Sequence, residues 1–167
     1  MNYHNITYPD MNNGAGLRVV LWLSGCSHHC AKCQNPQTWN PNSGILFDNK
    51  AHDELFEALS HDYISGITFS GGDPLNEANL YEVYNLINDI KTFFPNKTIW
   101  MYTGYTFDEI FEGTNSLRKQ IVQKCDILVD GKYIDSLKDV NYPWAGSINQ
   151  RIIDISQTIK EGVIRLI

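Results

Sequence analysis

With 167 residues, the chain is long enough to bury one hydrophobic core and too short for two domains of ordinary size, so we expect one domain over residues 1–167. Hydrophobic residues make up 43% of the chain and charged residues 19%, a globular composition that excludes a disordered chain. A formal net charge of −6, with 13 scattered basic residues, argues against nucleic acid or an anionic membrane as an electrostatically bound partner.

Short apolar runs alternate with helical patterns along the chain, which predicts β/α units around a mainly parallel sheet. The strands expected from these runs cover residues 18–23, 66–69, 98–102 and 127–129. Helices are expected over about residues 50–60, 77–94 and 107–124. The last third is less regular, with a loop expected at residues 142–146 and edge strands at residues 152–153 and 163–167.

The length of the chain also limits the kind of α/β fold. A complete barrel of eight β/α units needs about 250 residues, so we expect a partial (β/α) barrel with mainly parallel strands and an open side. Ligands of such folds gather at the carboxyl ends of the strands. Two distinctive segments follow strand ends: the cysteine loop, residues 26–33, and the glycine loop, residues 70–74. We therefore expect these two loops to form the site.

We expect no signal peptide and no membrane span in this sequence. Residues 1–5 contain no basic segment followed by an apolar one, which argues against a signal peptide. The longest apolar run, residues 19–23, is far too short to span a membrane. We expect a cytoplasmic protein with no membrane partner.

Three of the four cysteines, Cys26, Cys30 and Cys33, lie in the cysteine loop with the spacing Cys-x3-Cys-x2-Cys. Such clustering indicates metal ligation rather than disulfides. Structural zinc needs four ligands, and a loop this short can hardly complete a tetrahedron with the adjacent His28 or His29. A 4Fe-4S cluster can take three thiolates from a short loop and keep one iron open for a small molecule. The spacing favours the cluster, and zinc stays open as the alternative.

The glycine loop reads Ser70-Gly71-Gly72-Asp73-Pro74. Paired glycines allow backbone conformations and close ligand approach that side chains forbid. Turn chemistry alone explains this composition as well as a binding role does. Its position at the end of the strand that follows the cysteine loop favours the binding role.

The cysteine spacing, followed by a Gly-Gly-acid loop after the next strand, resembles the radical S-adenosylmethionine superfamily over most of the chain. The resemblance implies that S-adenosyl-L-methionine binds the open iron and is reductively cleaved to a 5′-deoxyadenosyl radical, which takes hydrogen from the substrate. It also implies that Cys26, Cys30 and Cys33 are the metal ligands, with no catalytic residue beyond the cofactor ligands.

The residues that the resemblance places at the cosubstrate are Lys32, Cys33, Gln34, Ser70, Gly71, Gly72 and Asp73. Asp73 stands in the place of the family's acid and would receive the ammonium group of S-adenosyl-L-methionine, together with the glycine backbone. The pattern departs from the family at Lys32, because many members have an aromatic residue just before the third cysteine. The adenine contacts are therefore left unassigned.

Five further segments narrow the resemblance: residues 13–18, 33–39, 100–105, 130–133 and 146–151. In this order and at this length, they are similar to the activating proteins of anaerobic ribonucleoside-triphosphate reductases. This similarity implies that the partner is the large subunit of such a reductase and that the substrate is a glycine near its C-terminus, which becomes a glycyl radical. It further implies a low-potential electron donor such as flavodoxin.

Other functions stay open on the sequence alone. Within the superfamily, the chain could activate another glycyl-radical enzyme, such as pyruvate formate-lyase, or act on a small molecule as a deazaguanine-forming synthase does. Outside it, the cysteines and one histidine could form a zinc-binding interaction module without catalysis.

Several residues near these motifs also have ordinary structural interpretations. Aromatic residues that alternate along a strand, as Trp100 and Tyr102 do, usually fill a core. The pair Asp130-Gly131 is typical of a turn, although its place at a strand end also suits a ligand contact. Cys125 is expected to be a small buried hydrophobe. His28 and His29 are expected to be loop residues near the cluster, where hydrogen bonding could tune it.

Overall fold

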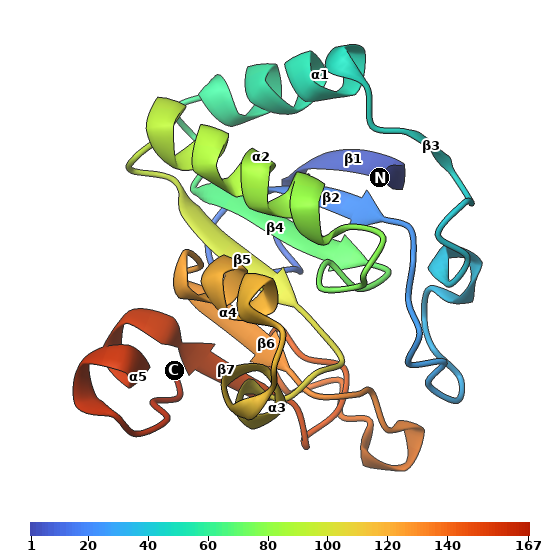
Figure 1. The fold of residues 1–167 in the computed structure, drawn as a ribbon, viewed down its shortest axis with the longest axis vertical. Helices are drawn as coiled ribbons and strands as arrows, with labels where there is room; N and C mark the ends of the chain where they lie inside the picture. Colours follow the sequence, from blue (N-terminus) through green and yellow to red (C-terminus); the bar gives the residue numbers. More distant parts are fainter.

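Four parallel strands form the centre of a seven-stranded sheet in the computed structural model, which describes residues 1–167 (Figure 1). The parallel strands, in their spatial order, are β2 (Arg18–Leu23), β4 (Gly66–Gly71), β5 (Thr98–Tyr102) and β6 (Ile127–Asp130). Antiparallel strands extend the sheet on both sides: β1 (Asn2–Asp10) and β3 (Ile45–Leu46) beyond β2, and β7 (Arg151–Asp154) beyond β6. The fold is α/β with a mixed sheet that is parallel in its centre.

The expected strand arrangement is only partly confirmed. Three of the six strand pairings are parallel and three are antiparallel, so the sheet is mixed rather than mainly parallel. The order β3-β1-β2-β4-β5-β6-β7 leaves β3 and β7 as unpaired edges, and the sheet is open. The expected partial barrel is therefore not confirmed by the pairing.

Helices cover one face of the sheet (Figure 1). The helices are α1 (Asn49–Ser60), α2 (Leu80–Phe93), α3 (Phe107–Glu112), α4 (Ser116–Gln123) and α5 (Ile155–Glu161). Short 3₁₀ helices are η1 (Pro36–Thr38) and η2 (Asp135–Leu137). None of the helices combines the length and the apolar character that crossing a membrane requires.

The two faces of the sheet serve different purposes, because side chains alternate along each strand. On the covered face, Leu21, Phe69 and Met101 are fully buried in a core of 27 residues that includes apolar positions of α1, α2 and α4. On the opposite face, the next residues along the same strands, Trp22 and Tyr102, line a cavity. The core therefore lies on the helix-covered face of the sheet, and the cavity lies on the opposite face.

The structure differs from the sequence-based expectations at three places. The predicted helix over residues 107–124 is two helices, because α3 ends at Gly113 and the Asn115 side chain caps α4 by accepting from two backbone N–H groups. Residues 163–167 do not form a strand, and only an isolated bridge joins Leu166 to Ile153. The sequence pattern gave no indication of α5, which Asp154 caps and a left-handed Gly162 ends.

Candidate metal centre

A cavity of about 640 Å³ lies over the sheet face opposite the helices and reaches the carboxyl ends of the parallel strands. The residues expected at the site that line it are Cys26, Cys30, Gln34, Ser70, Gly71, Gly72 and Asp73. Lys32 and Cys33, which were also expected there, do not line the cavity. The structure therefore brings the cysteine loop and the glycine loop together at one place, as the topology of the strands predicted.

The cysteine loop turns back on itself directly after β2. The Gly25 N–H donates to the Thr38 carbonyl at 2.7 Å and the Cys26 N–H donates to the Trp39 carbonyl at 2.9 Å, so η1 supports the start of the loop. Within the loop, His29 and Lys32 have left-handed backbone φ angles of 48° and 56°. The turn that follows is closed by a hydrogen bond from the Cys33 N–H to the Cys30 carbonyl at 3.1 Å.

The three thiols fit thiolate ligation of an iron–sulfur cluster. All three are free and partly exposed. Burial raises the pKa of the Cys26 thiol to about 11 and also raises that of Cys30, so a cationic metal is needed to favour their thiolates at neutral pH. Backbone N–H groups of His28 and His29 face Cys26, and that of Tyr133 faces Cys30; these donors favour the thiolate forms. No three His, Cys, Asp or Glu side chains converge on a single ion, which a cluster does not require because each thiolate binds a different iron.

The glycine loop packs directly against the start of the cysteine loop. The Gly72 N–H donates to the Leu23 carbonyl at 2.7 Å and the Asp73 N–H donates to the Gly25 carbonyl at 2.8 Å. A Cβ atom on Gly72 would lie 2.6 Å from the Gly25 carbonyl oxygen, and Gly71 has a φ of 94°. The close approach for which these glycines are needed is thus first of all to the neighbouring protein backbone.

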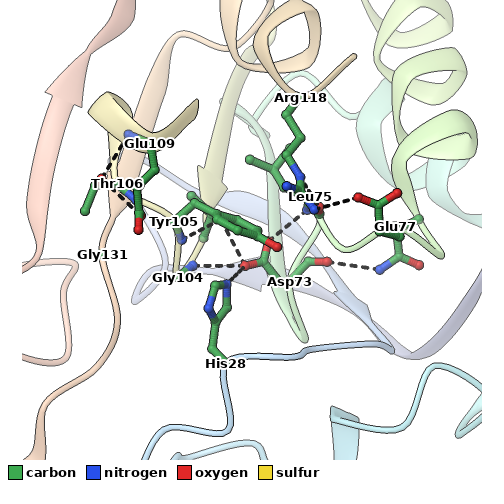
Figure 2. A network of polar contacts seen from close by, with 12 residues as sticks. His28, Asp73, Leu75, Glu77, Gly104, Tyr105, Thr106, Glu109, Arg118 and Gly131 are labelled. Carbon is green, nitrogen blue, oxygen red and sulfur yellow. Dashed lines mark hydrogen bonds and ion pairs between the residues drawn. The ribbon is translucent and has the colours of Figure 1, made fainter. Parts of the chain in front are cut away.

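The Asp73 carboxylate is buried, with the residue 2% exposed, and is surrounded by hydrogen-bond donors (Figure 2). Its Oδ1 accepts from the Leu75 N–H at 2.8 Å and lies 3.0 Å from the Thr103 hydroxyl. Its Oδ2 accepts from the Gly104 N–H at 3.0 Å and lies 2.7 Å from His28 Nε2. Thr103 and Gly104 line the same cavity, and sequence reasoning did not single out either residue for a role in the site.

Lys32 is held outside the cavity by a different contact. Its Nζ lies 2.8 Å from Asp135 Oδ2, and Asp135 Oδ1 also accepts from the Tyr133 hydroxyl at 3.0 Å. The Lys32 side chain is 76% exposed, so this ion pair contributes little to stability. Tyr133 does line the cavity, so an aromatic ring lies near the cysteine loop even though position 32 carries none.

The segment of residues 140–146 forms a second wall of the cavity. The Tyr102 hydroxyl donates to the Trp144 carbonyl at 2.7 Å, and the Trp144 and Trp100 rings meet edge to face at 5.3 Å. The core interpretation is confirmed for Trp100, which is 3% exposed, whereas Tyr102 lines the cavity. The two residues at the end of β6 have different roles. Gly131 lines the cavity. The buried Asp130 carboxylate accepts from Arg151 and from a backbone N–H of α3.

Cys125 lies in the helix-covered core, 5% exposed, with its Sγ 3.5 Å from the Ile121 carbonyl oxygen. Its expected role as a buried hydrophobe is confirmed. We predict that Cys125→Ala keeps its iron and loses about 1 kcal/mol of unfolding free energy, because only a small buried group is removed. Iron analysis and urea unfolding test this, and a variant that cannot hold the cluster would show that Cys125 belongs to the metal centre.

The family comparison agrees with this site. A family model for a "4Fe-4S single cluster domain" matches residues 12–153, a range that includes both loops. The chain is therefore an iron–sulfur cluster protein of this single-cluster class.

Whole-length relatives define the family more narrowly. The anaerobic ribonucleoside-triphosphate reductase-activating protein of Escherichia coli (strain K12) is 41% identical over 152 residues, which cover 90% of this chain and 96% of the relative. The protein of the same name from Enterobacteria phage T4 is 42% identical over 152 residues, covering 91% and 93%. That from Vibrio cholerae serotype O1 is 40% identical over 154 residues, covering 91% and 97%. The chain belongs to the family of anaerobic ribonucleoside-triphosphate reductase-activating proteins, which confirms the resemblance found in the sequence.

Proposed function

We propose that this chain is an activase of the radical S-adenosylmethionine type that installs a glycyl radical on the large subunit of an anaerobic ribonucleoside-triphosphate reductase. Cys26, Cys30 and Cys33 would hold a 4Fe-4S cluster, and S-adenosyl-L-methionine would be its cosubstrate. When bound together, these groups would supply a 5′-deoxyadenosyl radical able to abstract a glycine α-hydrogen. The observation that carries the proposal is that the cysteine loop and the glycine loop meet at one cavity in a chain of this family.

The chain's own residues would bind and orient the cosubstrate. Ser70, Gly71 and Gly72 line the cavity, and their small size leaves room for the polar methionine end close to the backbone. Gln34 lines the same cavity one residue after the third cysteine. Lys32 and Cys33 do not line the cavity, and we keep them in the proposed cosubstrate site as the residues that precede Gln34.

The cavity also has an opening suited to a protein substrate. Met11 and Val140 line the cavity and are 70% and 84% exposed, so the cavity is open to solvent at these residues. Trp22, Tyr102 and Trp144 also line the cavity, are only partly exposed and give it apolar surface. A radical must be kept from water and side reactions, so a partner that brings its glycine into this opening would complete the enclosure.

The remaining partners follow from the same proposal. Reduction of the cluster requires a low-potential electron donor, for which flavodoxin is a suitable class of protein. The named relatives favour a ribonucleotide reductase over other glycyl-radical enzymes and over a small molecule. The single-cluster family favours iron over zinc at the cysteine loop.

The test is a reconstituted activation reaction under anaerobic conditions. With a reductant, S-adenosyl-L-methionine and the reductase large subunit, we expect 5′-deoxyadenosine and an electron paramagnetic resonance doublet on the partner's glycine. A partner in which that glycine is alanine should show no doublet even if it binds. If the wild-type partner gains no glycyl radical while a small substrate is turned over alone, the activase proposal is wrong.

A further inference from the structure

The Asp73 carboxylate is the point at which three strand-end loops meet. Asp73 belongs to the glycine loop after β4, His28 to the cysteine loop after β2, and Thr103 and Gly104 to the loop after β5. The donors from all three loops lie within 3.0 Å of the carboxylate oxygens. The carboxylate therefore fixes the positions of the loops that surround the cavity.

The acceptor capacity of this carboxylate is already used. An ionised carboxylate offers about four lone-pair positions. In the structure, four donor groups face it: the backbone N–H groups of Leu75 and Gly104, the Thr103 hydroxyl and His28 Nε2. A direct bond to the ammonium group of a cosubstrate would need a fifth position or the loss of one of these partners.

His28 is the side chain through which the cysteine loop reaches this carboxylate. Its side chain is 8% exposed, and because a carboxylate only accepts, the contact at 2.7 Å requires Nε2 to donate. The ring occupies the space above the Gly104 backbone, where a Cβ atom would lie 2.3 Å from His28 Cδ2. Gly104 is thus needed because the imidazole occupies the place of a side chain.

Further contacts connect the imidazole to Asp73 by a second path, through Tyr105, Arg118 and Leu75 (Figure 2). His28 packs edge-on against Tyr105, with ring centroids 4.5 Å apart. The Arg118 guanidinium lies 4.2 Å from the Tyr105 ring centroid, and its Nε donates to the Leu75 carbonyl at 2.9 Å. Leu75 in turn donates its N–H to Asp73, so the imidazole is held from several sides.

We propose that His28 and Asp73 form a positioning pair that sets the cysteine loop against the glycine loop, and that Asp73 does not itself accept the ammonium group of the cosubstrate. The pair matters because a cosubstrate bound to the open iron and to the glycine loop at once needs a fixed distance between the two loops. A small misplacement of such groups can lower the reaction rate about 100-fold. The cosubstrate part of this inference rests on the proposed function; the pairing itself does not.

The first experiment tests the pairing in the full chain without iron. A double-mutant cycle compares His28→Ala, Asp73→Asn and the double variant by thermal unfolding. We expect both single variants to lower the unfolding midpoint and the double variant to unfold close to the more affected single variant. His28→Gln, which keeps a donor, should unfold at a midpoint close to that of the wild type.

His29→Ala is the matched control, because His29 is exposed, lies between the same two cysteines and contacts no carboxylate. Additive effects of the two substitutions would overturn the pair.

The second experiment measures the affinity of the iron-loaded variants for S-adenosyl-L-methionine by calorimetry. We expect His28→Ala to weaken binding about 10-fold, as loss of an outer positioning contact does, and His28→Gln and His29→Ala to stay near wild type. In a chain that already carries His28→Ala, Asp73→Asn should weaken S-adenosyl-L-methionine binding little further. If Asp73→Asn instead weakens binding by the same factor with and without His28, Asp73 acts on the cosubstrate independently of His28 and the inference is wrong. If the iron-loaded wild-type chain does not bind S-adenosyl-L-methionine at all, the proposed function is wrong. The double-mutant cycle without iron then decides by itself whether His28 and Asp73 form a pair.

Discussion

Replacing Cys26, Cys30 or Cys33 with alanine is expected to remove the iron–sulfur cluster and all activase activity. The cysteine loop offers three thiols, and the fourth cysteine of the chain lies in the helix-covered core. A cluster bound through three thiolates cannot be held with one of them missing, because no other thiol is within the loop to replace it. Each of the three substitutions should therefore have the same effect.

Iron and sulfide analysis after anaerobic reconstitution, together with the ultraviolet–visible spectrum, measures this result. Wild-type protein should hold about four irons and four sulfides per chain. Urea unfolding of the iron-free variants should show that the fold survives, since the three cysteines are partly exposed. A fully active Cys30→Ala protein, or an active wild-type preparation with stoichiometric zinc and no iron, would contradict the cluster assignment.

The central strands were predictable because their burial leaves a local signal. β2, β4, β5 and β6 lie in the middle of the sheet, and such strands have continuous apolar runs. β1 carries Asn, His and Asp among its apolar residues and lies beside only a two-residue strand on its outer side, so no comparable run marks it. The helices α3 and α4 follow each other closely, and only the end of α3 at Gly113 and the cap at Asn115 separate them.

The site was predictable only where its residues carry their own signal. The spacing of three cysteines and the paired glycines are local patterns, and strand order brings them to the same edge of the sheet. The contacts of Asp73 with Thr103 and Gly104 arise because β5 lies beside β4, and neither residue type indicates such a role by itself. His28 was noticed beside the cysteines, but its partner could not be known before the loops were placed together.

Arg18 shows how a residue within a recognised sequence segment can serve the fold rather than the chemistry. It lies at the amino end of β2, whereas the cysteine loop follows the carboxyl end of the same strand. The side chain is fully buried and has no carboxylate partner. Its guanidinium donates to the carbonyls of Ala15, Ile67 and Thr98 and to the hydroxyls of Thr68 and Thr98. Burial lowers its pKa to about 10, still far above neutral pH, so the group stays charged.

These contacts join three strands and a loop of the cavity wall. Thr68 belongs to β4 and Thr98 to β5, so Arg18 links the amino ends of β2, β4 and β5. The Thr68 hydroxyl in turn donates to the Asn13 carbonyl at 2.7 Å, and Asn13 lines the cavity. A Cβ atom on Gly14 would lie 2.7 Å from Arg18 Cδ, so the Arg18 side chain leaves room only for glycine at position 14.

Arg18→Met is therefore expected to destabilise the protein by about 3 kcal/mol or more, because several buried acceptors lose their donor and each unsatisfied group costs about 1–3 kcal/mol. Methionine keeps much of the length of the side chain, so the loss reports the hydrogen bonds more than a cavity. The matched control is Arg165→Met, whose exposed ion pair with Glu161 should change stability by no more than about 0.5 kcal/mol. Urea unfolding of both iron-free variants at neutral pH gives the comparison. If Arg18→Met unfolds at the same urea concentration as Arg165→Met, the guanidinium does not hold the three strands together.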